Sequence, residues 1–195
     1  MFAELRAKSA YSFGDGTAAP EVLVERAAEM GYTALALCDD ADVGGAIRFA
    51  LGAEARGVKP ILGCEVYVAS GSRFEKSGPQ TETNHLVLLA ETDQGYKNLI
   101  KLVSAGYTEG FYYKPRIDKE LLRKHSEGLI GLSACLKGEI NEHIVATRER
   151  EAEAAAKWEK ARELDPTNPA PWNNLANYYG HKSPVKKAFE YYAKA

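Results

Sequence analysis

The chain has 195 residues, of which 45% are hydrophobic and 27% charged, and its formal net charge is −2. This composition is that of a globular protein, with room for one ordinary domain or two small ones. The near-neutral charge excludes a strong field that would draw nucleic acid or acidic lipid to the whole molecule, and no apolar run is long enough for a membrane span. Three scattered cysteines favour a reduced, cytoplasmic setting over a disulfide framework.

The first 135 residues alternate short apolar runs with amphipathic segments. Buried strands are predicted over residues 34–38, 60–68, 85–90 and 129–133, and helices over 21–30, 41–56 and 95–105. A polar stretch over residues 70–83 predicts a surface loop. Alternation of strands and helices predicts an α/β fold with parallel strands.

Several predicted strands end in a polar or thiol residue. Asp40, Glu65 and Cys135 follow or close apolar runs, whereas His85 opens one. In parallel α/β barrels the functional groups gather at the carboxyl ends of the strands. The pattern therefore predicts a site at that rim.

The character of the sequence changes after about residue 146. Residues recur at an offset of 34, as in Ala154 with Ala188 and Trp158 with Tyr192, which is the period of the tetratricopeptide repeat. We expect a first domain over residues 1–146 and an α-helical hairpin of this type over 147–195. About one and a half repeats cannot bury their faces alone, so the hairpin would pack on the first domain or on a protein partner, or fray.

Three long motifs connect the chain to a known family. They are GYKNL at residues 95–99, GFYYKPRID at 110–118 and GLIGLSAC at 128–135, and residues 31–69 follow the same family. Over residues 2–144 the chain resembles the PHP domain at the amino end of the bacterial DNA polymerase III alpha subunit. The resemblance implies a distorted, here apparently truncated, (β/α) barrel. We expect no polymerase active site in this chain.

The resemblance also implies a set of metal ligands. Such domains hold two or three ions for phosphoester hydrolysis, a reaction that clustered metals assist. Asp15, Glu65, His85 and Cys135 match retained ligand types, and a late Asp-x-His pair has no counterpart. At former histidine positions stand two carboxylates, Glu4 and Asp40, and two cations, Arg6 and Lys8.

Arg6 is the most consequential of these replacements. A guanidinium is always charged and would repel a dication at the same place. We therefore expect Arg6 to neutralise Glu4, Asp15, Asp40 or Glu65 in a salt-bridged remnant of the metal site. No cofactor is expected, and if one binds it is zinc or manganese.

Each residue also has a simpler interpretation. His85 can bond a backbone carbonyl, and Cys135 can be a small core residue. Asp39 and Asp40 can cap the next helix, and Asp15 can belong to a turn. We expect Arg116 to form an ion pair with Asp118 or Glu120 instead of binding phosphate. We expect packing instead of stacking on bases for the aromatic residues Tyr107, Phe111, Tyr112 and Tyr113.

Three functional hypotheses follow. The first is a catalytically silent PHP-type module that acts in DNA replication through contacts with other replication proteins, with weak or no binding of nucleic acid by itself and none of membranes. The second is a residual metal-dependent phosphoesterase or 3′–5′ exonuclease. The third is a designed or fused chain with no selected activity.

Overall fold

The computed structural model describes residues 2–77 and 82–164. The chain divides into two compact units, the first ending at Asn141 and the second beginning at Glu142. The predicted boundary after residue 146 falls within one long helix and stays a prediction. The tetratricopeptide hairpin was predicted over residues 147–195, and its residues 165–195 lie outside the described residues, so the hairpin stays a prediction.

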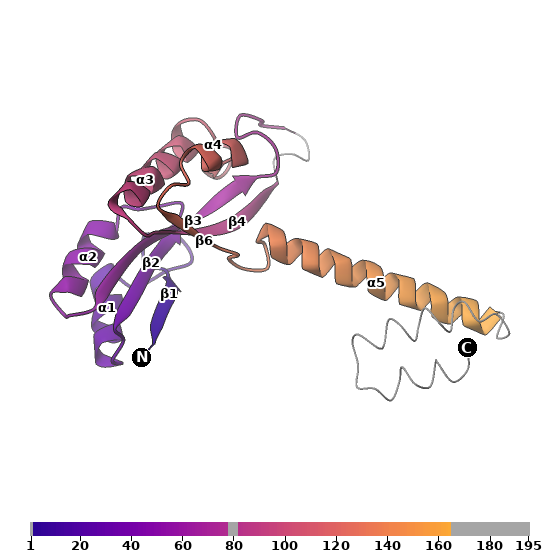
Figure 1. Ribbon diagram of the computed structural model, residues 1–195, viewed down its shortest axis with the longest axis horizontal. Coiled ribbons are helices and arrows are strands. Elements are labelled where there is room, and N and C mark those ends of the chain that lie inside the picture. Colours follow the sequence, from indigo (N-terminus) through magenta and orange to yellow (C-terminus); the bar gives the residue numbers. More distant parts are fainter. Residues whose placement is uncertain (1, 78–81, 165–195) are drawn as a thin grey trace. The chain divides into compact units, whose positions relative to one another are not determined.

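Short strands and helices alternate along the first unit (Figure 1). In chain order the elements are β1 (Ala3–Ala7), α1 (Pro20–Glu29), β2 (Ala34–Asp40), α2 (Ala46–Glu54), β3 (Lys59–Ala69), β4 (Thr83–Ala90), α3 (Asp93–Thr108), β5 (Arg116–Ile117), α4 (Lys119–Lys124), β6 (Leu129–Leu132) and α5 (Glu139–Leu164). No helix in the described ranges combines the length and apolarity needed to cross a membrane.

The described strands form one mixed sheet in the order β1-β2-β3-β4-β6, with β5 beside the end of β3. Strands β1, β2 and β3 are parallel, as predicted, but β4 runs antiparallel to β3. The prediction of parallel strands is therefore wrong for β4, because β3 and β4 are consecutive strands without a crossover helix between them. The reversal places His85, at the start of β4, opposite Tyr67, near the end of β3.

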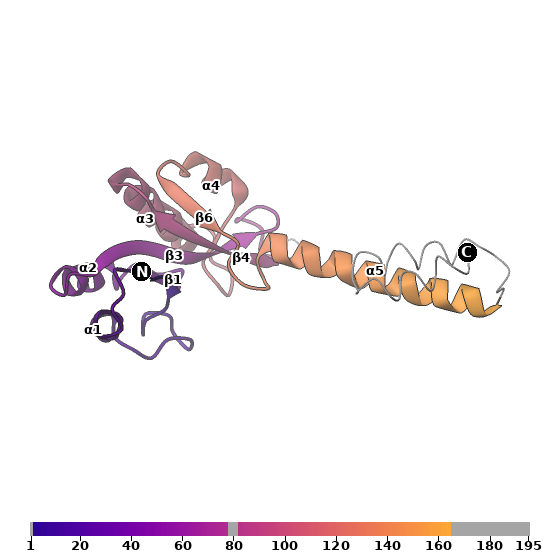
Figure 2. The same cartoon turned by 60° about the horizontal axis from the view of Figure 1, so that its bottom comes forward.

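Two pairs of helices, α1 with α2 and α3 with α4, cover the same face of the sheet. Beside β2, Leu35 and Leu37 pack with α1 and α2, and further along β3 Val66 packs with α3. Figures 1 and 2 show α1 and α2 beside the β1–β2 part of the sheet and α3 and α4 beside β4 and β6. Because side chains alternate along a strand, the intervening residues of β2, β3 and β4 project from the opposite face. We call it the helix-free face, because none of the helices α1 to α4 of the first unit packs on it in the described residues.

The helix-free face carries its own small core. Ala36, Cys38 and Val87 are fully buried there. A Cβ built on Gly63 would lie 2.6 Å from the Cys38 Sγ and 2.7 Å from a Leu89 methyl carbon, so only glycine fits this position. Burial raises the pKa of the Cys38 thiol to about 12, which keeps it protonated and unreactive.

Asp39 ties the loop after β1 to the sheet. Its carboxylate accepts hydrogen bonds from the Ser9 amide at 2.6 Å, the Ser9 hydroxyl at 2.8 Å and the Ser12 hydroxyl at 2.7 Å. The interpretation of Asp39 or Asp40 as a helix cap is wrong, because α2 begins after Gly45 without a side-chain cap. Asp39 instead satisfies the polar groups of a buried turn.

The Arg116 side chain supports a different loop. It is 1% exposed and donates to the carbonyl oxygens of Gly110, Arg73 and Glu75 at 3.0, 3.1 and 2.6 Å. Its predicted ion pair is wrong, since Asp118 pairs with Arg73 and accepts a hydrogen bond from the Leu121 amide.

The Asp39 bonds can be tested by Asp39→Asn. An amide turned toward three donors loses most of these bonds, so the free energy of unfolding should fall by about 3 kcal/mol. Urea denaturation at neutral pH measures the change. Asp93→Asn, in the exposed first turn of α3, is the control and should change stability by less than about 0.5 kcal/mol. Equal stability of the two variants would contradict this role of Asp39.

Candidate functional site

The predicted site residues meet on the helix-free face of the sheet, where β2 and β3 end and β4 begins. Glu65 of β3 lies at the centre, and its side chain is fully buried. Asp40 of β2 is its register partner, and His85 of β4 pairs with Tyr67, two residues further along β3. The predicted residues therefore lie together at one end of the parallel strands, although β4 runs in the opposite direction.

Arg6 reaches Glu65 from the edge strand. The Arg6 Nε and Nη2 atoms lie 2.7 and 2.6 Å from the same carboxylate oxygen, Oε2. The β1–β2 register shifts between Glu4 and Ala7, where three steps along β1 match two along β2. Such a bulge redirects the side chains of a strand. Although partial burial alone lowers the pKa of Arg6, the hydrogen bond and charge of Glu65 outweigh it and raise that pKa.

Lys8 forms a second cationic centre in the site. Its Nζ lies 2.7 Å from Asp40 Oδ1, 3.1 Å from Asp15 Oδ2 and 3.8 Å from Glu65 Oε2. Burial tends to lower the pKa of Lys8, but the hydrogen bonds to Asp40 and Asp15 raise it overall. Lys8 lowers the pKa of the exposed Asp15, whereas burial raises the pKa of Asp40 despite the same neighbour.

His85 and Cys135 complete the cluster on the other side of Glu65. His85 Nδ1 lies 2.6 Å from Glu65 Oε1 and 3.5 Å from Cys135 Sγ. The ring of His85 therefore contacts a carboxylate and not the backbone carbonyl of the simpler interpretation. Both contacts use the same ring nitrogen. In a catalytic triad the nucleophile bonds one ring nitrogen of the histidine and the carboxylate bonds the other, so these three residues do not form a catalytic triad.

Ligand atoms of Glu65, His85 and Cys135 all lie within 4.8 Å of one another, a grouping that could hold one metal ion. Both oxygens of Glu65 already have partners, however, and one partner is a permanent cation. A cluster of two or three ions does not fit this donor set, because Arg6 and Lys8 fill the space between the remaining carboxylates. A single ion fits only if Arg6 leaves Glu65.

Not every predicted residue joins the cluster. The structure gathers Arg6, Glu65, His85 and Cys135, with Asp40 and Asp15 held through Lys8. The Glu4 carboxylate instead accepts a local bond from the Arg6 amide at 3.0 Å.

Sequence reasoning missed Tyr67, two residues after Glu65 on the same strand face. Its ring stacks edge-on against His85 at 5.0 Å and lies 4.5 Å from the Lys114 Nζ. Burial and the charge of Asp40 raise the pKa of Tyr67 to about 12. The period-two alternation of a strand was the signal that could have identified it.

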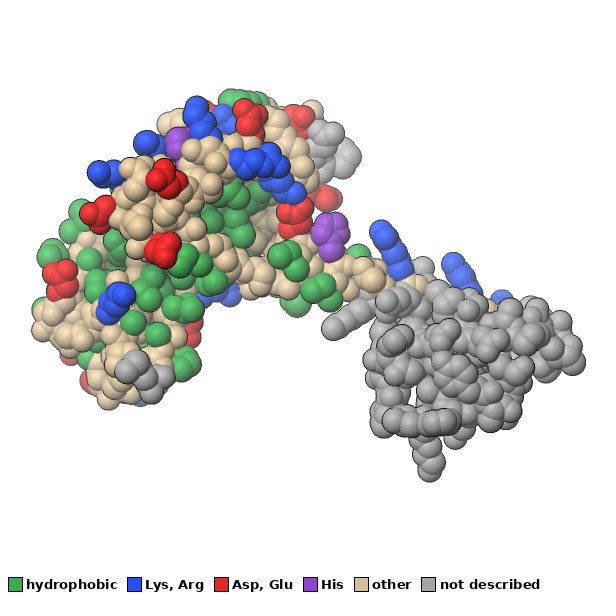
Figure 3. All heavy atoms as spheres, viewed as in Figure 1, with side chains coloured by type: hydrophobic (Ala, Val, Ile, Leu, Met, Phe, Trp, Pro, Cys, Tyr) green, Lys and Arg blue, Asp and Glu red, His purple; other side chains and the backbone are tan. Residues whose placement is uncertain are grey.

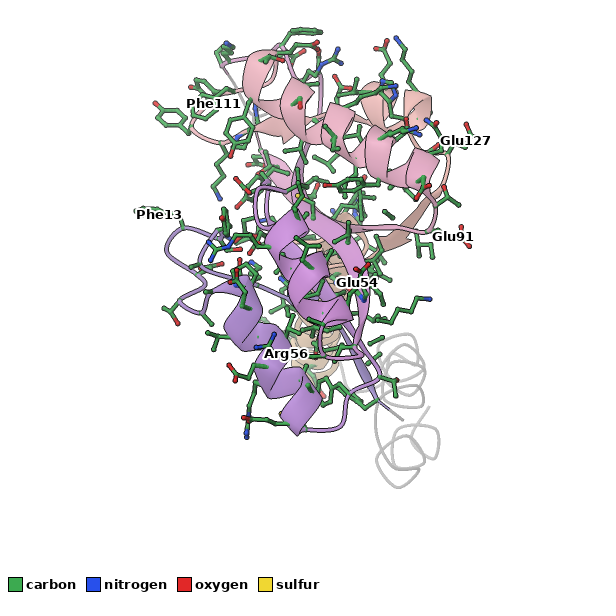
Figure 4. All side chains as sticks on the ribbon, turned by 90° about the vertical axis from the view of Figure 1, so that its left-hand side faces the viewer. Phe13, Glu54, Arg56, Glu91, Phe111 and Glu127 are labelled. Atoms are coloured by element: carbon green, nitrogen blue, oxygen red, sulfur yellow. The ribbon has the colours of Figure 1, made fainter. Side chains whose placement is uncertain are left out.

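The four aromatic residues for which packing was expected contact one another in pairs. Tyr107 and Phe111 stack with ring centroids 6.3 Å apart, and Tyr112 and Tyr113 meet edge-on at 4.6 Å, although Phe111 and Tyr113 stay 48% and 85% exposed. Phe13 is fully exposed. Figure 4 shows Phe13 and Phe111 projecting outward from their loops.

Comparison with known proteins places this sequence in a family. The sequence profile of the PHP domain matches residues 4–164. This chain belongs to the PHP domain family. It is 45% identical over 158 residues to the DNA polymerase III subunit alpha of Treponema pallidum, covering 80% of this chain and 14% of that protein. The subunit of Aquifex aeolicus is 45% identical over 144 residues, covering 70% of this chain and 12% of that protein. The chain thus spans about an eighth of these relatives.

Solved structures show more distant likeness. A protein from Bifidobacterium adolescentis assigned as a metal-dependent phosphoesterase aligns with a TM-score of 0.40 at 18% identity, covering 53% of this chain and 32% of that one. An amidohydrolase from Chromobacterium violaceum, with bound sulfate and no metal, aligns with a TM-score of 0.41 at 20% identity, covering 98% and 54%.

The Arg6–Glu65 contact can be tested by Arg6→Met. The change leaves a buried carboxylate without its main cation, so the free energy of unfolding should fall by about 2 kcal/mol, less than for a fully buried pair because Arg6 stays partly hydrated. Arg26→Met is the matched control. It removes an exposed pair with Glu29 and should cost less than about 0.5 kcal/mol. Thermal and urea unfolding measure both, and equal losses would argue against a special role for Arg6.

Proposed function

We propose that this chain is a metal-depleted PHP module that acts through structure and protein contact within a replicative polymerase of the polymerase III alpha type. Its similarity to the amino-terminal part of those subunits supports the setting. The contact of the Arg6 guanidinium with Glu65 supports the loss of metal chemistry. Replication proteins are the proposed partners.

The charge distribution makes this the favoured function. Three carboxylates, those of Asp15, Asp40 and Glu65, face the two cations Arg6 and Lys8. The cluster therefore needs little further positive charge. A divalent ion at the Glu65 carboxylate would meet the guanidinium a few ångströms away, and this repulsion amounts to several kcal/mol in a partly buried site. The ion pairs replace the electrostatic role of the metals and keep the strand ends together.

A second candidate rests on the grouping of Glu65, His85 and Cys135. These residues would hold one ion if Arg6 turned away, and such an ion would supply Lewis-acid activation of a phosphoester. His85 and Cys135 would have to be in their metal-binding protonation states, with the imidazole neutral and the thiol deprotonated. This function requires the chain to lose the Arg6–Glu65 contact, which is why we rank it second.

Metal binding separates the two candidates. Isothermal titration with zinc and with manganese should give no stoichiometric site of sub-micromolar affinity in the unaltered chain. Arg6→His removes the guanidinium and adds an imidazole, so zinc binding should tighten at least about a hundredfold. Arg26→His adds the same group on the exposed surface and should change nothing. Stoichiometric tight zinc in the unaltered chain would overturn the metal-depleted module.

Hydrolysis is the complementary measurement. Release of nucleotides from a labelled single-stranded oligonucleotide, with manganese or zinc present, should be indistinguishable for the unaltered chain and Glu65→Gln. The reason is that the buried carboxylate is committed to Arg6 and His85. Turnover that requires added metal and disappears in Glu65→Gln would instead establish the second candidate.

A further inference from the structure

A surface groove runs between α3 and α4, away from the Glu65 cluster. Its volume is about 400 Å³. Figure 3 shows lysine and arginine side chains, one histidine and several acidic side chains over these two helices. The groove is lined by Arg73, Ile100, Lys101, Ser104, Ala105, Thr108, Glu109, Leu121, Lys124 and His125.

Positive charge in this groove is compensated at one end only. Arg73 pairs with Glu109 at 2.7 Å and with Asp118 at 2.9 Å. Lys101 and Lys124, by contrast, form no ion pair within residues 2–77 and 82–164. The end of the groove near these lysines therefore carries positive charge that no described carboxylate binds in an ion pair.

His125 lines the same groove as the two uncompensated lysines. It follows the last turn of α4, and its backbone amide bonds the Leu121 and Leu122 carbonyls, which fixes its place. Burial lowers the pKa of His125, and the charges of Lys101 and Lys124 lower it further. The charged groups around it in the groove are Lys101 and Glu109 from the α3 side, Lys124 from α4 and Arg73 from the preceding loop.

We propose that this groove binds a phosphate group, held by Lys101, Lys124 and His125. Two ammonium groups match the charge of a phosphate dianion, and the imidazole adds a third donor. The Ser104 hydroxyl also lines the groove and offers a further donor, whereas the Thr108 hydroxyl already donates to the Ser104 carbonyl oxygen at 3.0 Å. A tetrahedral oxyanion can use this number of donors, whereas a carboxylate has only two oxygens. The site shares no residue with the Glu65 cluster and does not depend on the proposed function.

Binding should depend on pH in a definite direction. The empty groove disfavours the imidazolium, because Lys101 and Lys124 repel it. A bound anion offsets this repulsion and raises the pKa of His125, so binding takes up a proton. Affinity should therefore increase as the pH falls from about 8 to about 6. A phosphodiester strand is the suitable probe, since its own charge stays constant over this range.

The experiment is a titration of the full chain followed by amide NMR. Inorganic phosphate and a single-stranded thymidine oligonucleotide are added separately. We expect saturable shifts confined to α3, α4 and the loop after it. Lys101→Gln with Lys124→Gln should weaken binding at least about tenfold. Lys59→Gln with Lys76→Gln removes the same charge from exposed positions elsewhere and should leave binding unchanged.

The outcomes discriminate between the sources of phosphate. An oligonucleotide that binds at least about tenfold more tightly than phosphate identifies a nucleic-acid strand, and equal affinity identifies a free phosphate. His125→Gln should retain binding but lose its pH dependence. The proposal fails if no shift saturates, if both lysine pairs weaken binding equally, or if an oligoglutamate peptide binds more tightly than either phosphate probe. Circular dichroism verifies that each variant is folded.

Discussion

The buried carboxylate of Glu65 sets the conditions for the rest of the site. An isolated charge in the protein interior is too costly to persist, so it must be paired or neutralised. In this chain Arg6 contacts the Oε2 atom of Glu65 and His85 contacts the Oε1 atom, and Lys8 lies further away from Oε2. The bulge in β1 and the reversed β4 are the backbone features that bring these groups together.

Under the proposed function, a fold of the PHP type keeps its geometry without metal. Strand ends rich in carboxylates repel one another unless cations lie between them. A guanidinium and an ammonium provide that charge through hydrogen bonds from the protein itself, and they need no ion from solution. The exchange is not equivalent chemically, because neither cation offers an open coordination position for a substrate.

The sequence predicted the participants better than their arrangement. Arg6 was expected to neutralise a carboxylate, and the helices and strands follow the apolar periodicities. Strand direction was not predictable, because a period of two is the same for parallel and antiparallel pairing. Lys8 was recognised as a replaced ligand, but its contacts with Asp40 and Asp15 depend on the loop that Asp39 holds in place. Arg116 donates hydrogen bonds to backbone carbonyl oxygens of the surrounding loops. The sequence around Arg116 does not show which distant carbonyls lie near it, so these bonds could not be predicted.

Net charge is a poor guide to local binding in this molecule. The net charge of −2 argues against a strong electrostatic field over the whole surface. Carboxylates that are paired elsewhere in the protein nevertheless do not neutralise a lysine that has no partner. Screening limits the reach of a surface charge to about 10 Å in ordinary salt. The lysines between α3 and α4 therefore act on a nearby anion almost independently of the carboxylates around Glu65. Charged side chains that form ion pairs within the protein stabilise its fold. A charged side chain without such a partner offers a ligand of opposite charge the largest gain in binding free energy.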